Sequence, residues 1–64
     1  MNNNLAAIRS DKGITQTELA QRSGVSRTLI NQLETGVRDV ITTKTMIKLS
    51  KALETPIADI FLLK

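Results

Sequence analysis

Apolar residues recur at intervals of three and four positions along the chain, with polar residues between them. That spacing places apolar side chains on one face of an α-helix, whereas a strand would need an alternation that no segment sustains. The pattern therefore predicts an all-α fold. The residues that carry it most clearly are Leu5, Ile8, Leu19, Ile30, Leu33, Met46, Ile47, Leu49 and Leu53.

Glycines and short polar side chains indicate where each helix begins and ends. Glycine adopts the left-handed backbone conformation that closes a helix, and Ser or Thr before a helix accepts a hydrogen bond from a free backbone N–H. These signals predict five short helices. They run from about Asn4 to Lys12, from Thr15 to Arg22 or Ser23, from a cap at Ser26 to the closing Gly36, from a cap at Thr42 or Thr43 to about Glu54, and onwards from Thr55 and Pro56.

Local details sharpen these boundaries. Thr15 is followed three residues later by Glu18, which is the spacing of a capping box in which two backbone N–H groups are satisfied reciprocally. Gly24 predicts a tight turn between the second and third helices, because it tolerates a positive backbone φ. Pro56 is expected at the first position of the last helix, where its missing N–H breaks no helical hydrogen bond.

A helical wheel of residues 26–36 separates an apolar face from a polar one. Ile30 and Leu33 fall on the inward side. Opposite them lie side chains whose forked or short geometry matches base edges in a major groove, where arginine pairs with guanine and asparagine or glutamine with adenine. On this helix alone, an ordinary solvated face is the alternative. The outward row consists of Arg27, Thr28, Asn31 and Gln32.

Residues 16–33 also carry a recognisable spacing. Ala20 is small where two helices would approach each other, Gly24 lies in the turn, and the branched Ile30 lies on the inner face of the second helix. With Leu19, Val25 and Leu33, this spacing resembles the helix-turn-helix signature of the lambda-repressor-like (Cro-repressor-type, xenobiotic-response-element-like) DNA-binding family. The resemblance continues through LAAIRSDKGITQTELA and TMIKLSKAL, so it covers nearly the whole chain. It implies a compact five-helix domain whose third helix lies in the major groove while the second crosses the backbone.

The resemblance also implies which side chains read bases. The family's base-reading positions agree with the outward row of the wheel, to which they add the residue at the helix start. Leu29 flanks this row without a polar group, and it either packs against a neighbouring helix or contacts a thymine methyl. The expected base-reading set is Ser26, Arg27, Thr28 and Gln32, with Asn31 beside them.

Phosphate contacts are expected at helix starts, because free backbone N–H groups there attract anions. Gln16 stands where the family has a glutamine that clamps the DNA backbone, and a solvated surface is the alternative. Lys48 and Lys51 are interpreted as a solvated face of the fourth helix. The resemblance implies a second strip of phosphate contacts in the loop and helix start that follow the third helix. The expected phosphate-binding set is Thr15, Gln16 and Thr17 at the second helix, with Thr35, Arg38, Thr43 and Lys44 in that second strip.

Two charged residues border apolar stripes rather than water. Arg9 lies next to the stripe of the first helix, and Glu34 next to that of the third. The family pairs a basic residue with the glutamate that ends the third helix, so the resemblance implies a partly buried salt bridge between them. Glu34 is therefore interpreted as structural and not catalytic.

The last helix is apolar all the way round, although one small core can cover only one side of it. Its final residues then either fold back as a short tail or pair with a second copy, since an exposed apolar patch usually marks an interface. We expect a homodimer that reads a palindromic site with two recognition helices one duplex turn apart, roughly 34 Å. The expected interface is Phe61, Leu62 and Leu63.

Composition narrows the function further. The 64 residues allow a single domain over 1–64, and with no Cys and no His neither a metal site nor nucleophilic catalysis has a candidate constellation. A net charge of +3 permits a polyanionic partner. We expect a cytoplasmic chain without a membrane span, cofactor or small-molecule substrate, and not an enzyme.

The function predicted from the sequence is that of a sequence-specific regulator of transcription, a dimeric repressor that binds the major groove of double-stranded DNA. Two alternatives stay open at this point. One is an antitoxin-like subunit that uses the same fold to hold a protein partner, and the other is a nonspecific nucleic-acid binder. Salt titration against matched and scrambled duplexes separates them.

Overall fold

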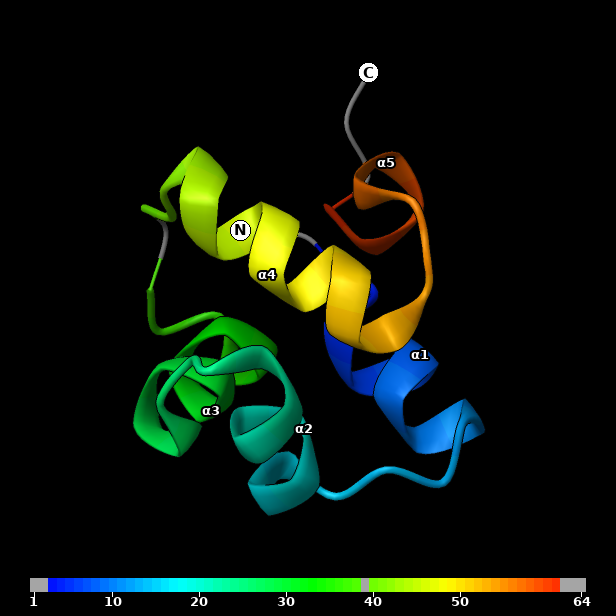
Figure 1. Cartoon of the computed structure of the whole chain (residues 1–64). Coiled ribbons are helices and arrows are strands. Elements are labelled where there is room, and N and C mark those ends of the chain that lie inside the picture. The colour runs from blue at the N-terminus through cyan, green and yellow to red at the C-terminus, as the bar shows by residue number, and fades with distance from the viewer. Residues whose placement is uncertain (1–2, 39, 62–64) are drawn as a thin grey trace.

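The computed structural model describes residues 3–38 and 40–61, which form a compact arrangement of helices (Figure 1). Over these residues the chain contains no strand, so the predicted all-α fold is confirmed. None of the helices described is long and apolar enough to cross a membrane. The helices are α1 (Leu5–Asp11), α2 (Gln16–Ser23), α3 (Arg27–Thr35), α4 (Thr43–Leu53) and α5 (Ile57–Phe61).

Three of these helices begin with a side-chain cap, as the sequence predicted. The Oγ1 of Thr15 accepts from the N–H of Glu18 at 3.0 Å, and the Oγ of Ser26 accepts from the N–H of Leu29 at 3.1 Å. Thr42, rather than Thr43, caps α4. Each cap satisfies a backbone donor that has no partner within its helix, which fixes where the helix starts.

The reciprocal half of the predicted capping box is not formed among the described residues. The carboxylate of Glu18 accepts instead from Nη2 of Arg22, one helical turn further on, at 3.4 Å. A glutamate at this position can reach either the backbone before it or a cation four residues later, and here the ion pair is made. Pro56 was predicted at the first position of the last helix, but α5 begins at Ile57, so Pro56 lies just before the helix. Its carbonyl accepts from the N–H of Ile60.

Gly24 and Gly36 end α2 and α3 in the left-handed conformation, with φ of 75° and 78°. A side chain built at either position would meet no atom within 4 Å, so space is not the reason for glycine there. The reason is the positive φ, which costs other residues about 1 kcal/mol or more. Gly24 thereby allows α3 to start only a few residues after α2 ends.

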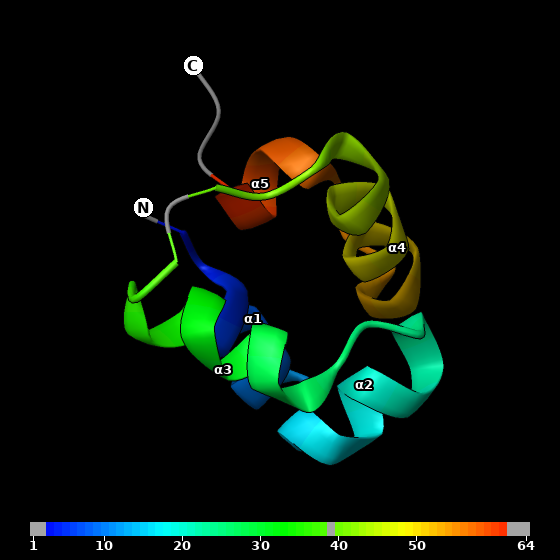
Figure 2. The ribbon, with the colours of Figure 1, turned by 90° about the vertical axis from the view of Figure 1, so that its left-hand side faces the viewer.

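All five helices bury side chains in one core, around which they are arranged (Figure 2). Leu29 packs against the rim of this core, so its packing interpretation is the one the structure supports. Ile47 departs from the apolar pattern of α4, because 40% of it is exposed. The core consists of Leu5, Ile14, Leu19, Val25, Ile30, Leu33, Leu49, Leu53, Ile60 and Phe61.

The segment before α1 is hydrogen-bonded to both α3 and α5. Asn3 donates from Nδ2 to the carbonyl of Leu33 in α3 at 3.0 Å, and its Oδ1 accepts from the N–H of Leu5. The backbone N–H of Asn4 donates to the carbonyl of Ile60 in α5 at 2.6 Å. These bonds attach α1 to the end of α3 and so help to hold the helix that carries the candidate site.

The predicted dimer interface is wrong at Phe61. This side chain is 4% exposed because α5 turns it, together with Ile60, into the core of its own chain. A residue buried in this way offers no surface to a second copy. Leu62 and Leu63, the other members of the predicted interface, lie outside the described residues.

Candidate nucleic-acid interface

The outer side of α3 presents the polar row that the sequence predicted. Arg27, Thr28 and Asn31 are exposed and Gln32 is half-buried. The opposite side of the same helix is anchored in the core, which prevents α3 from rotating the row away from solvent. Ser26, at the N-cap, is also exposed, although its hydroxyl is engaged with the backbone of Leu29.

The beginning of α2 lies against this row. Nε2 of Gln16 donates to Oδ1 of Asn31 at 3.3 Å, across the two helices. Gln16, Arg27, Thr28 and Asn31 together line a shallow hollow of about 360 Å³. The predicted phosphate-binding residues of α2 and the predicted base-reading residues of α3 therefore share one continuous surface, and Thr15 and Thr17 are exposed at its edge.

An ion pair lies directly beneath this surface. Nε of Arg9 contacts Oε2 of Glu34 at 2.6 Å, and Nη2 donates to Oε1 at 3.0 Å, so the guanidinium grips the carboxylate with two hydrogen bonds. The side chains are 18% and 6% exposed. Nη1 of Arg9 also donates to the carbonyl of Ile14 at 2.7 Å. The salt bridge expected from the sequence is thus present, and it joins α1, α3 and the segment before α2.

The protonation of this pair follows from its contacts. Burial by itself would raise the pKa of Glu34, but the hydrogen bonds from Arg9 and Gln16 and the charge of Arg9 hold that pKa below its ordinary value. The hydrogen bond to Glu34 raises the pKa of Arg9, an effect that burial only partly offsets. Glu34 is therefore ionised at neutral pH and acts only as a hydrogen-bond acceptor.

Gln16 completes the link between the ion pair and the surface. Its Nε2 donates to Oε1 of Glu34 at 3.0 Å as well as to Asn31. An uninterrupted series of hydrogen bonds therefore runs from Arg9 through Glu34 and Gln16 to Asn31, from the interior to the outer face of α3. The hydrogens of the Gln16 amide are both engaged within the protein.

The remaining predicted phosphate contacts lie beyond α3. Thr35 is exposed and donates from Oγ1 to the carbonyl of Asn31 at 2.9 Å, while Nε of Arg38 donates to Oε1 of Gln32 at 3.2 Å. Thr43 and Lys44 are exposed in the first turn of α4. In Figure 2, α3 crosses the near side of the molecule with the beginning of α2 below it and the beginning of α4 above it.

The comparison with known families agrees with this geometry. The family model described as helix-turn-helix matches residues 5–60, which include all five helices. The chain belongs to the lambda-repressor-like helix-turn-helix family. In this helix-turn-helix protein the motif itself is formed by α2 and α3, and the membership supports a DNA-binding regulator. No curated protein matches the chain.

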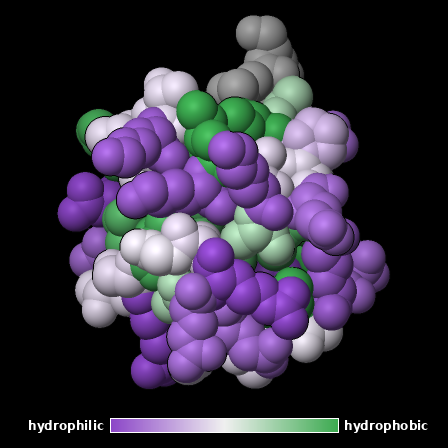
Figure 3. Space-filling model, in the orientation of Figure 1, coloured by the Kyte–Doolittle hydropathy of each residue, from purple (hydrophilic) through white to green (hydrophobic). Residues whose placement is uncertain are grey.

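Hydrophilic residues dominate the face of the helix-turn-helix protein that Figure 3 shows. Hydrophobic residues appear on this face as smaller patches, one of them near the top of the view. Among the described residues, the large hydrophobic side chains with most exposure are Val37 at 74% and Val40 at 75%, in the segment after α3.

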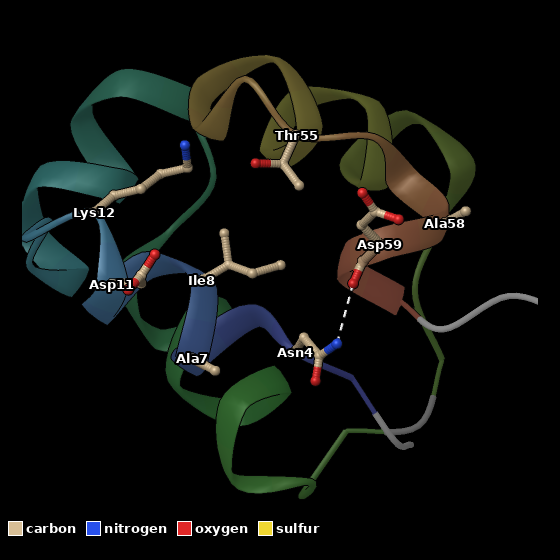
Figure 4. A pocket seen from close by; sticks show the side chains of 8 residues that line it. All are labelled: Asn4, Ala7, Ile8, Asp11, Lys12, Thr55, Ala58 and Asp59. Atoms are coloured by element: carbon tan, nitrogen blue, oxygen red, sulfur yellow. Dashed lines mark hydrogen bonds between the residues drawn. The ribbon is translucent and has the colours of Figure 1, made fainter.

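A larger hollow, of about 780 Å³, lies between α1 and α5, away from the motif (Figure 4). No predicted site residue contributes to it, and Asn4 Nδ2 donates across it to the carbonyl of Asp59 at 3.2 Å. Within residues 3–38 and 40–61, no three His, Cys, Asp or Glu side chains are grouped to hold a metal ion. The hollow between α1 and α5 is lined by Asn4, Ala7, Ile8, Asp11, Lys12, Thr55, Ala58 and Asp59.

Sequence reasoning did not find the hydrogen bonds that join the site residues to one another. Gln16 and Asn31 are 15 positions apart, and Gln32 and Arg38 are six positions apart across the end of a helix. Neither separation belongs to the periodicity of a single helix, so no sequence pattern signals such pairs. Residues predicted to act separately on bases and on phosphates are in fact bonded together.

Proposed function

We propose that this protein is a sequence-specific regulator that represses transcription by occupying a palindromic operator as a homodimer. The observation that carries the proposal is the exposed polar row on α3, positioned beside the beginning of α2. A helix-turn-helix protein inserts the second helix of its motif, which is α3 in this chain, into the major groove. There arginine and amide side chains meet base edges. Within this proposal, Ser26, Arg27, Thr28, Asn31 and Gln32 read bases.

Affinity comes mainly from phosphates, which flank the groove on both sides. The backbone N–H groups of Gln16 and Thr17 open α2 and have no acceptor earlier in that helix, so they suit an anion. Lys44 in the first turn of α4 and Arg38 after α3 add positive charge beyond the other end of the row. The net charge of +3 favours this partner, and we expect binding to weaken as salt rises.

The dimer rests on different support. Since Phe61 is buried, only Leu62 and Leu63 remain of the predicted interface. The exposed Val37 and Val40 provide an apolar surface close to the end of α3, and such surfaces commonly mark protein contacts. The same valines favour the second candidate function, an antitoxin-like subunit whose fold holds another protein.

Other parts of the proposal come from the sequence. A cytoplasmic location is expected of a chain that acts on DNA, and the lack of His and Cys argues against catalysis. A single domain over residues 1–64 is expected from the length. Activity as a repressor follows from operator occupancy alone, which requires no additional domain.

The test is a selection of bound duplexes from a random pool, followed by salt titration of selected and scrambled sequences. We expect an enriched palindrome, a linear fall of log affinity with log salt, and tighter binding of the selected duplex by about a thousandfold or more. Equal binding of both duplexes would establish a nonspecific binder. Absence of binding to any duplex, with a protein captured through Val37 and Val40, would establish the antitoxin-like alternative.

A further inference from the structure

We propose that Gln16 and Arg38 orient the two amides of the α3 row so that both present hydrogen-bond donors, which makes the site select guanine and thymine rather than adenine. This inference rests on the proposed function and specifies the bases that it reads. It assigns Gln16 and Arg38 a positioning role in addition to any contact they make with phosphate.

The orientation of Gln32 follows from its bond with Arg38. A guanidinium has only donors, so the 3.2 Å contact from Nε of Arg38 requires the amide oxygen of Gln32 to face it. Nε2 of Gln32 is then the free end of the amide, with no acceptor among the described residues. Adenine is read by an amide that supplies its oxygen and its nitrogen together. While Arg38 holds the oxygen, the end of the Gln32 amide that is left without a partner is its donor, Nε2.

The orientation of Asn31 follows from the buried ion pair. Glu34 is ionised and can only accept, so Gln16 must direct Nε2 towards it, at 3.0 Å. The second hydrogen on that nitrogen is the one donated to Oδ1 of Asn31, at 3.3 Å. The amide oxygen of Asn31 is thus engaged by a side chain of the same protein, and among the described residues its Nδ2 has no acceptor. A charged residue therefore orients each amide. Arg38 orients Gln32 directly, and Glu34 orients Asn31 through the amide of Gln16.

The consequence is a face composed mainly of donors. Arg27 also only donates, and among the described residues of the outward row just the Thr28 hydroxyl has an acceptor that no hydrogen bond already engages. In the major groove guanine presents two adjacent acceptors, N7 and O6, and thymine presents O4, whereas adenine and cytosine place an amino donor towards the protein. A face of donors is complementary to guanine and thymine, whereas the amino groups of adenine and cytosine oppose it.

The first arm of the experiment needs no DNA. Side-chain NMR of the whole chain would compare the wild type with Arg38→Ala, with Lys44→Ala as the matched loss of a cation. We expect slow exchange of the Arg38 Nε–H in the wild type, and a shift of the Gln32 amide signals in Arg38→Ala but not in Lys44→Ala. Unchanged Gln32 signals in Arg38→Ala would overturn the orientation of Gln32.

The second arm measures base preference on duplexes that carry each base at every half-site position. The wild type should prefer guanine or thymine over adenine by about tenfold or more at the positions that Asn31 and Gln32 read. Arg38→Ala should shift the ratio towards adenine at the Gln32 position, and Lys44→Ala should weaken all duplexes alike. Gln32→Glu, which replaces the free donor by an acceptor, should favour cytosine or adenine there.

The outcomes separate the two proposals. A wild-type preference for adenine, or an Arg38→Ala variant whose loss is uniform like that of Lys44→Ala, overturns the donor-face inference and leaves sequence-specific binding intact. If the wild type binds no duplex specifically, the proposed function fails and the base preference fails with it. In that case the NMR arm still shows whether Arg38 holds the amide.

Discussion

The two sides of α3 perform different tasks with adjacent residues of one short helix. On the inner side Ile30 and Leu33 are 0% exposed and belong to the core, while on the outer side Arg27 and Thr28 contact solvent. Burial constrains the inner side chains by shape and leaves the outer ones free to vary in chemistry. Recognition can therefore reside on the outer side without a cost in stability, and Glu34 lies between the two sides and serves both.

The largest expected effect comes from the inner side. Leu33→Ala should lower the free energy of unfolding by about 2–5 kcal/mol, because it leaves a cavity in a fully packed position. A chain of this length has only about 3–10 kcal/mol in total, so the variant should be close to unfolding. Urea denaturation followed by circular dichroism measures this. A loss below about 1 kcal/mol would show that Leu33 does not occupy the core as described.

The second-largest effect is expected at the ion pair of Arg9 with Glu34, which lies between the two sides of α3. Arg9→Met keeps most of the side-chain volume but leaves the carboxylate of Glu34 without its cation, which should cost about 3 kcal/mol in the same denaturation assay. This value is at the low end for buried pairs because Arg9 is 18% exposed. The double variant Arg9→Met with Glu34→Leu is the control. It should recover much of the loss, because no unpaired charge remains.

Acid should weaken the same pair in the intact protein. Because folding lowers the pKa of Glu34, its contribution to stability is fully present above the ordinary glutamate pKa of about 4.3 and is lost as the pH falls through the lower folded value. Glu34→Gln removes this titration. As the pH falls from about 4.3 towards the lower folded pKa, we expect the unfolding free energy of the variant to depend less on pH than that of the wild type, and parallel curves would contradict the assignment.

On the outer side the expected effect moves from stability to binding. Arg27→Ala should change the unfolding free energy by no more than about 0.5 kcal/mol, because the side chain is exposed. It should weaken binding of the selected duplex by about 1–3 kcal/mol and relax preference at one base pair. Fluorescence anisotropy with a panel of single-base variants measures both. Equal weakening on every duplex would instead assign Arg27 to the phosphates.

The smallest effect is expected at the exposed ion pair of α2. Glu18 and Arg22 lie 3.4 Å apart with side chains 45% and 55% exposed, so solvent screens their attraction. Arg22→Ala should lower the unfolding free energy by only about 0.5 kcal/mol or less. Compared with Arg9→Met, this variant tests whether burial rather than charge alone accounts for the difference between the two pairs.

Much of the fold could be predicted because its signals are local. Caps at Thr15, Ser26 and Thr42 and the glycines after α2 and α3 act within a few residues, and the observed helix boundaries lie close to those expected. The polar row on α3 was predictable from helical periodicity. The pairing of Arg9 with Glu34 spans 25 positions, and periodicity alone showed only that each borders an apolar stripe.

Phe61 shows where that reasoning failed. A helix that is apolar on every side does not reveal which side the core will take, and the structure places Phe61 inside. Glu18 shows a second limit. A side chain with two possible partners at similar reach is settled by small differences in geometry, which the spacing of residues does not contain.

The sequence by itself determined the helices, their caps, the apolar stripes and the polar row on α3, because these depend on neighbours within one or two helical turns. Only the tertiary structure decided which way the amides of Asn31 and Gln32 face. That choice depends on Gln16, which packing brings from α2 against Glu34 and Asn31, and on Arg38 in the segment after α3. An amide has a donor end and an acceptor end of nearly equal size, so its direction is set by whether the group that contacts it donates or accepts.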